Sequence, residues 1–125
     1  MIQTEEMKER VQIHIGKRVV VYIAGPMAGL INKNRDNFDE AEAELKHLGY
    51  VVLNPAVLPD GMDYSRYMPI CLSMVEQADA VLMLPGWEKS KGASLEHQYA
   101  QYQSKLICTS VNELDSICSF GKLDV

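Results

Sequence analysis

Four short stretches of the chain are almost continuously apolar and rich in β-branched residues. They are 18–24 (RVVVYIA), 50–55 (YVVLNP), 79–86 (DAVLMLPG) and 105–110 (KLICTS). A strand covered on both faces has such a continuous run, whereas a strand with one solvent-exposed face alternates apolar and polar positions. The four stretches therefore predict short buried strands. The first three end at or next to a glycine or a proline, as strands that enter turns do.

Between these strands, apolar residues recur at intervals of three and four, which is typical of a helix with one buried face. The predicted helices span 34–48, 63–78 and 93–104, and a short helix is expected around 112–118. We expect Asn34 or Asp36 to cap the first helix and Gly49 to end it. Pro69 falls early in the second helix, either in its first turn or at a kink.

Strands that alternate with helices predict a parallel sheet with right-handed crossovers. The expected fold is a small doubly wound α/β domain, Rossmann- or flavodoxin-like, with about four to five parallel strands and helices on both faces. A chain of 125 residues is long enough for one such domain with a single core. We expect this domain over 18–125 and an N-terminal arm or short helix over 1–17.

Charge and composition exclude several classes of protein. The net charge is −5, and no basic block is present to follow the phosphates of a nucleic acid polymer. No apolar run approaches the ~20 residues of a membrane span, and the acidic start MIQTEEMKER is unlike a secretion signal. The three cysteines are widely spaced, without metal-ligand spacing, and indicate reduced thiols. We expect a cytoplasmic protein that needs no metal or cofactor and binds neither a nucleic acid polymer nor a membrane.

The pattern also predicts where a ligand should bind. In a doubly wound parallel sheet the ligand lies beyond the carboxyl ends of the strands. The first three predicted strands leave the sheet at 25–27, 54–55 and 85–87, so these segments should lie along one edge. Glu96 falls at the same edge, in the first turn of a helix expected to begin near Ala93.

Two interpretations of Glu96 remain open from the pattern alone. A capping glutamate at the third helical position would pair with a hydroxyl three residues earlier, but Ala93 has none, although the helix dipole alone favours an acidic side chain there. Alternatively, the dipole keeps Glu96 ionised next to a turn at Gly92 that lets a ligand approach the backbone. An ionised carboxylate held against a sugar can attack the anomeric carbon or stabilise an oxocarbenium-like centre.

The segments VYIAGPMAG and QADAVLMLPGWEKSKGASLEHQYA, with the elements between them, resemble the nucleoside 2-deoxyribosyltransferase-like superfamily. The resemblance spans about residues 18–110 and is closest to a small branch common in phages and bacteria. It implies that Glu96 matches the nucleophile of the deoxyribosyltransferases and of the related deoxynucleoside 5′-monophosphate N-glycosidases. It also implies that Tyr22 matches a first-strand tyrosine near the nucleophile, and that Ser90 stands where the hydrolases carry a phosphate-binding serine.

The same resemblance implies a substrate site around the first strand exit and the loop before Glu96. Ser90 and the backbone at Gly92 would hold the 5′ end of a nucleotide, while Trp87 and the Met27 loop would cover the base. The expected substrate-binding residues are Gly25, Pro26, Met27, Trp87, Ser90, Gly92 and Ser94, with Glu96 and Tyr22 as catalytic residues. Related proteins build their sites at subunit contacts, so the resemblance also implies a homodimer or a higher homo-oligomer.

Two positions depart from the family pattern. Cys71 stands where both enzyme groups carry an aspartate that handles the proton of the base, and Ala28 stands where the hydrolases carry a phosphate-gripping arginine. A thiol with an ordinary pKa near ~8.5 is a poor donor to a leaving base. The replacements to consider are Lys89 or Lys91 for the missing charge and Asp60 or Asp63 for the missing proton.

Two functions follow from this pattern. The first is cleavage of the N-glycosidic bond of a nucleoside or (deoxy)nucleoside 5′-monophosphate, by hydrolysis or by deoxyribosyl transfer, with Glu96 as the nucleophile. The second is binding of a nucleotide-derived ligand without catalysis, as a sensor or sponge on the same scaffold, which the departures at Cys71 and Ala28 favour. A small nucleotide or nucleoside is the expected partner in both.

Overall fold

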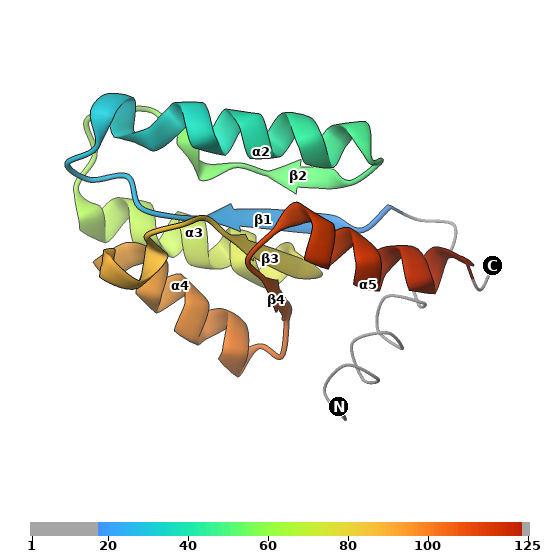
Figure 1. The fold of residues 1–125 in the computed structure, drawn as a ribbon. Helices are drawn as coiled ribbons and strands as arrows, with labels where there is room; N and C mark the ends of the chain where they lie inside the picture. Colours follow the sequence, from blue (N-terminus) through green and yellow to red (C-terminus); the bar gives the residue numbers. More distant parts are fainter. Residues whose placement is uncertain (1–17, 124–125) are drawn as a thin grey trace.

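A computed structural model describes residues 18–123 of the chain as a parallel sheet covered by helices (Figure 1). The sheet has four strands in the order β2-β1-β3-β4, and every pairing in it is parallel. The strands are β1 (Val20–Ala24), β2 (Val51–Leu53), β3 (Ala80–Met83) and β4 (Leu106–Cys108). The predicted doubly wound α/β fold is thereby confirmed. The predicted arm over 1–17 lies outside the described residues, and the domain boundary stays a prediction.

Within residues 18–123, four α-helices and three short 3-10 helices accompany the strands, and α5 follows the last strand. The α-helices are α2 (Arg35–His47), α3 (Tyr64–Gln77), α4 (Lys91–Tyr102) and α5 (Val111–Leu123). The 3-10 helices are η1 (Ile31–Asn34), η2 (Pro55–Val57) and η3 (Trp87–Lys89). None of the helices within 18–123 is both long enough and apolar enough to cross a membrane.

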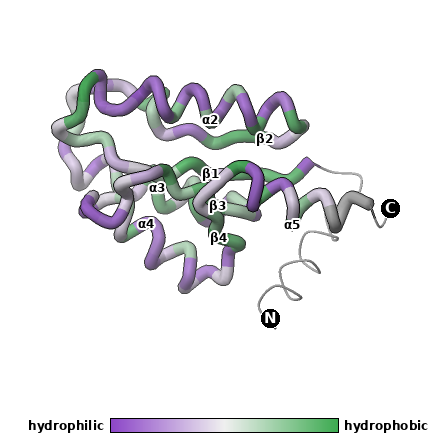
Figure 2. The backbone as a smooth tube through the Cα atoms, viewed as in Figure 1, coloured by the Kyte–Doolittle hydropathy of each residue, from purple (hydrophilic) through white to green (hydrophobic). Residues whose placement is uncertain are grey.

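The two faces of the sheet carry separate cores. Helices α2 and α5 cover one face, and α3 and α4 cover the other (Figure 1). Because successive side chains of a strand point to opposite faces, Val21 and Ile23 of β1 pack under α2 and α5, whereas Tyr22 and Ala24 pack under α3 and α4. The strands are accordingly apolar and the outer helix surfaces polar (Figure 2). Strand alternation thus directs Tyr22 toward α4, the helix that carries Glu96.

Helix α4 begins two residues before the predicted start near Ala93, because Ser90 caps it. The Ser90 side-chain oxygen accepts a hydrogen bond of 3.1 Å from the Ala93 amide. Glu96 consequently lies in the second turn of α4 and not at the third helical position. The capping interpretation of Glu96 is therefore wrong, since a side chain in the second turn is past the unpaired amides of the first.

Helix α5 is longer than the predicted 112–118, and polar groups at its start stabilise it. Ser110 accepts a hydrogen bond of 3.0 Å from the Glu113 amide, and the Glu113 carboxylate accepts one of 2.9 Å from the Thr109 amide. This reciprocal arrangement resembles a capping box, which satisfies amides that the first helical turn leaves unpaired.

The exits of β1 and β3 pack directly against each other at the carboxyl edge of the sheet. A Cβ added at Gly25, just after β1, would lie 2.8 Å from the Leu84 Cβ, just after β3. Real Cβ atoms do not approach so closely, so this position requires glycine for a close approach of two chain segments. The contact therefore holds the two strand exits close together at this edge of the sheet.

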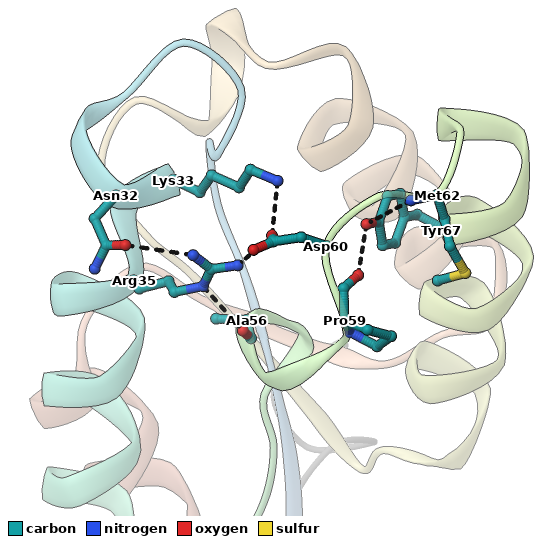
Figure 3. A network of polar contacts seen from close by, with 8 residues as sticks. All are labelled: Asn32, Lys33, Arg35, Ala56, Pro59, Asp60, Met62 and Tyr67. Atoms are coloured by element: carbon teal, nitrogen blue, oxygen red, sulfur yellow. Dashed lines mark hydrogen bonds and ion pairs between the residues drawn. The ribbon is translucent and has the colours of Figure 1, made fainter.

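The loops after β1 and β2 are tied together by a polar network at the same edge (Figure 3). Asp60 accepts hydrogen bonds from Lys33 at 2.8 Å and from Arg35 at 2.5 Å. The segment that presents these two cations has a left-handed backbone at Asn32, Lys33 and Asn34, with φ of 51°, 54° and 63°. Non-glycine residues adopt this conformation at a cost, so the surrounding contacts must hold it.

Candidate active site

Glu96 is buried at the boundary between α3, α4 and β1. Its side chain is only 6% exposed, and no salt bridge to it occurs within residues 18–123. A carboxyl group without a nearby cation is costly to ionise in such a place. Its burial is therefore not explained by a fixed ion pair.

Two other polar groups adjoin Glu96 in this core. The Tyr22 hydroxyl comes from β1 and the Cys71 thiol from α3, and both are close enough to Glu96 to shift its pKa. Tyr22 is fully buried, and its hydroxyl has no hydrogen-bond partner of good geometry in the described part of the chain. An unsatisfied buried hydroxyl costs about 1–3 kcal/mol, so it requires an explanation. We name these three residues the Glu96 cluster.

Burial dominates the electrostatics of the Glu96 cluster. It raises the pKa of Glu96 from its ordinary 4.5 to about 7, while the neighbouring Tyr22 hydroxyl and Cys71 thiol act in the opposite direction. Burial also raises the pKa of Cys71 to about 11, and the nearby Glu96 carboxyl adds to this. The pKa of Tyr22 lies well above its ordinary value for the same reasons. Glu96 is thus the group of the cluster that titrates near neutral pH.

These pKa directions bear on one prediction and on one alternative. Burial raises the pKa of Glu96, which acts against the ionisation that the helix dipole was expected to favour. Asp60 is also a poor candidate for the missing proton donor. Its ion pairs with Lys33 and Arg35 hold its pKa below the ordinary range, so it stays ionised.

The loop that leads into α4 is held in place by its own side chains. Trp87 stacks on His97, with ring centroids 4.2 Å apart and planes inclined by 14°. The Ser94 hydroxyl donates to the backbone oxygens of Trp87 and Glu88, at 3.2 and 3.3 Å. Trp87 also packs against the core under α3 and α4. One face of Trp87 is therefore covered by His97, and Ser94 has a structural role in addition to any role in binding.

The predicted glycine and loop residues have different surroundings. A Cβ at Gly92 would meet Met68 Sδ at 3.5 Å and Tyr64 at 3.6 Å, so its backbone faces α3 at the side of the Glu96 cluster. Met27, in contrast, packs against the core under α2 and α5, and Pro26 lines a cleft on that same side. The structure thus brings together Tyr22, Trp87, Ser90, Gly92, Ser94 and Glu96 on one side of the sheet, and it places Pro26 and Met27 toward the other.

A cleft of about 490 Å³ opens at the carboxyl edge of the sheet, but Glu96 does not line it. Its walls come from α2, from the exits of β1, β3 and β4, and from the start of α5. The sequence did not reveal this cleft, because the exposed face of α2 reads only as a polar helix surface. The contact between Glu96 and Cys71 was also not predicted, although Tyr64, Met68, Cys71 and Val75 share one face of α3 by their spacing.

Chemically, the Glu96 cluster combines a titratable carboxyl group with a phenol and a thiol. Such a set can form a bond to carbon or exchange a proton with a ligand. Within 18–123, no group of three or more His, Cys, Asp or Glu side chains is arranged to hold a metal ion. At the opposite edge of the sheet, the Asp79 carboxylate accepts a hydrogen bond of 2.8 Å from the Val20 amide, so it has a structural role there.

The fold of the chain resembles the structure described as a 2-desoxiribosyltransferase from Leishmania mexicana, with a TM-score of 0.57 and 22% sequence identity. The match covers 74% of this chain but only 65% of that chain, so the protein spans less than two thirds of the length of its structural neighbour. No curated protein matches the sequence. The model of a family described as a domain of unknown function (DUF4406) matches residues 19–109. The chain belongs to this family, which is part of the nucleoside 2-deoxyribosyltransferase-like superfamily.

Proposed function

We propose that the protein cleaves the N-glycosidic bond of a nucleoside or a deoxynucleoside 5′-monophosphate, with Glu96 as the nucleophile. One observation carries this proposal: within residues 18–123, a buried carboxyl group without a salt bridge lies beside a buried hydroxyl that no hydrogen bond of good geometry satisfies. Both are features that a ligand at this place would explain, because its sugar carbon would face the carboxylate and its polar atoms would satisfy the hydroxyl. Membership of the superfamily and the shared fold support the same chemistry.

The reaction would proceed in two steps. In the first, the Glu96 carboxylate bonds to C1′ of the sugar, the N-glycosidic bond breaks with its electron pair moving to the base, and the base takes up a proton from water. In the second, water attacks C1′ and gives up a proton to the solvent, the glycosyl ester breaks with its electron pair returning to the carboxylate, and free sugar or sugar phosphate leaves with Glu96 restored. A second base in place of water would make the protein a transferase. Tyr22 would position the carboxylate and favour its ionised form.

The 5′ group would lie at the start of α4. The Ser90 oxygen already accepts the Ala93 amide, and its own hydroxyl hydrogen can still donate to a phosphate oxygen. The amides of a helix start favour an anion, and Lys89 and Lys91 lie in the same segment. These features support a phosphorylated substrate over a free nucleoside. Trp87 would offer the face that His97 does not cover to the base.

The proposal is tested by incubating the purified chain with deoxynucleosides and their 5′-monophosphates and measuring free base by chromatography. We expect release of base that is lost by at least a hundredfold in Glu96→Gln and Glu96→Ala, since both remove the nucleophile. Glu88→Gln, an exposed residue of the preceding loop, serves as the control with unchanged activity. Base release that persists in both Glu96 variants would rule out this role.

The activity should also depend on pH in a defined direction. Because the nucleophile must be ionised and the pKa of Glu96 is about 7, kcat/KM should rise as the pH increases through about 7 and level off above it. An acid limb near pH 4.5, the ordinary range for glutamate, would show that another carboxylate carries the reaction.

A second candidate function is binding of a nucleotide-derived ligand without cleavage. The observation that favours it is the absence of a carboxylic acid beside Glu96: its described neighbours are a thiol and a phenol, and both have raised pKa values. A leaving base would then lack a good proton donor. Saturable binding of a deoxynucleoside monophosphate by calorimetry, with no free base after long incubation, would select this function.

We further propose that the protein forms a homodimer or a higher homo-oligomer. Exposed apolar side chains on α4 support this, since Leu95 is 39% and Tyr102 81% exposed. Light scattering after size-exclusion chromatography measures the mass directly. A monomer at about 100 μM would contradict the proposal.

A further inference from the structure

The cleft on the α2/α5 side of the sheet lies where α/β folds commonly bind ligands. In the strand order β2-β1-β3-β4, the chain turns from β1 toward β2 on one side and continues to β3 on the other, so the switch point is between β1 and β3. The cleft is lined by Pro26 after β1 and by Leu84 and Pro85 after β3. Its volume of about 490 Å³ falls within the ~300–1,000 Å³ of small-molecule sites.

This cleft is separate from the Glu96 cluster. The buried lining residues Ala41, Leu82 and Leu84 belong to the core under α2 and α5, whereas Tyr22 and Cys71 belong to the core under α3 and α4. A ligand of the cleft would touch the α2 surface and the start of α5, which the proposed function leaves unused.

The lining of the cleft indicates the charge and shape of a ligand. Its floor is apolar, formed by Ala41, Leu82 and Leu84, and its rim carries the carboxylates of Glu40 and Glu44. The lining contains no lysine or arginine. An apolar floor fits a planar ring, and a rim of carboxylates favours a cation or a hydrogen-bond donor and disfavours an anion.

One wall of the cleft is built at a conformational cost. Asn34, which lines it, has a left-handed backbone and lies in a run of three such residues. The side-chain amide of Asn34 donates a hydrogen bond of 2.9 Å to the backbone oxygen of Pro26, and its side-chain oxygen accepts one of 2.7 Å from the side-chain amide of Asn37. Two lining segments, the loop after β1 and the first turn of α2, are thereby joined. Such strain persists only where contacts hold it, and it is typical of functional sites.

We propose that this cleft is a second small-molecule site, which takes a planar ring compound bearing a cationic or neutral amino or amidino group. The inference does not depend on the proposed function, because none of its residues belongs to the Glu96 cluster. It predicts a neutral or cationic ligand between α2 and α5, whether or not an anionic ligand binds near α4.

The test uses three ring compounds of the same shape and different charge: benzamidine, benzamide and benzoate. Each is titrated into the ¹⁵N-labelled full chain, and amide shifts are followed by NMR. We expect saturable shifts at cleft amides, including Asn37 and Val111, with affinity decreasing from benzamidine to benzamide to benzoate. Dissociation constants of about 1–10 mM are expected for probes of this size.

Charge reversal at the rim provides the decisive comparison. In the double variant Glu40→Lys/Glu44→Lys, both changes are on the exposed surface of α2, and benzoate should now bind more tightly than benzamidine by about tenfold. Glu88→Gln, outside the cleft, should keep the wild-type order. The proposal is overturned by shifts confined to amides around Glu96, by no saturable shift at the cleft amides, or by an unchanged order in the double variant. Loss of base release in Glu96→Gln has no bearing on these outcomes.

Discussion

Replacing Glu96 by glutamine should stabilise the folded protein at neutral and alkaline pH. The side chain keeps its shape but loses the charge that its buried position disfavours. The unfolding free energy of the wild-type protein should change with pH in a defined direction. Since the folded pKa is raised, the unfolded chain ionises first, so Glu96 lowers stability as the pH rises from its ordinary pKa of 4.5 to about 7, and the loss is constant above this range.

The magnitude follows from the two pKa values. The interval from 4.5 to about 7, at about 1.4 kcal/mol per pH unit, corresponds to about 3 kcal/mol of unfolding free energy. No reduction for solvent screening applies, because the side chain is only 6% exposed. For a domain of this size, about 3 kcal/mol corresponds to a rise in Tm of roughly 10 °C.

The assay is urea unfolding of the wild type and Glu96→Gln at several pH values between 5 and 9. The quantity to compare is the difference in unfolding free energy between the two proteins. We expect it to grow with pH and to level off above about pH 8. A constant offset from the amide itself leaves this slope unaffected. Glu88→Gln is the matched control, since its carboxylate is exposed, and its difference should stay flat.

Two results would refute the reasoning. A difference between Glu96→Gln and wild type that stays constant from pH 5 to 9 would mean that the carboxyl group is not destabilised by burial. A variant that becomes progressively less stable than the wild type as the pH rises would mean that the ionised carboxylate is stabilised in the folded protein, for instance by a cation. In either case, the account of the Glu96 cluster would be wrong.

Three further predictions concern neighbouring positions. Tyr22→Phe removes the hydroxyl that lowers the pKa of Glu96, so the acid limb of kcat/KM should move to higher pH; an unmoved limb would contradict the interaction between the two side chains. Gly25→Ala should lower the unfolding free energy by about 1–3 kcal/mol, because its Cβ would lie 2.8 Å from Leu84. In the matched variant Gly92→Ala the contacts are 3.5 Å or longer, so the unfolding free energy should be unchanged or higher by up to about 1 kcal/mol. Equal losses in the two variants would contradict the packing argument. Ser90→Ala should lower stability by about 1 kcal/mol through loss of the α4 cap, and unchanged thermal unfolding would show that the cap is not formed in solution.

The sheet and its helices were predictable because their signals are local. Continuous apolar runs and helical spacing are properties of short segments, and parallel strands joined by helices permit few topologies. Helix starts were less well predicted. The cap at Ser90 moves the start of α4 by two residues, because a hydroxyl in a charged loop is not distinguishable by pattern from a solvated serine.

The candidate site was likewise predictable only in part from the sequence. The location of Glu96 at the carboxyl edge of the sheet followed from the pattern of strands and helices, and the proximity of Tyr22 to Glu96 was implied by the resemblance to the nucleoside 2-deoxyribosyltransferase-like superfamily. The burial of Glu96 was not predictable from the sequence, because a glutamate in a polar segment is expected to be ionised. Only the packing of α3 against α4 raises its pKa to about 7. The same applies to the contacts of Cys71 and to the stacking of Trp87 on His97, which join residues of no characteristic spacing.

The sequence by itself therefore determined the alternation of strands and helices, the parallel sheet and the edge at which chemistry should lie. Tertiary structure alone decided which groups are removed from water, which side of the β1 and β3 exits each residue occupies, and where a cleft opens between α2 and α5. The physical reason is that backbone preference and amphipathicity act over a few residues. Desolvation and cavity shape depend instead on side chains that meet only when distant segments pack together.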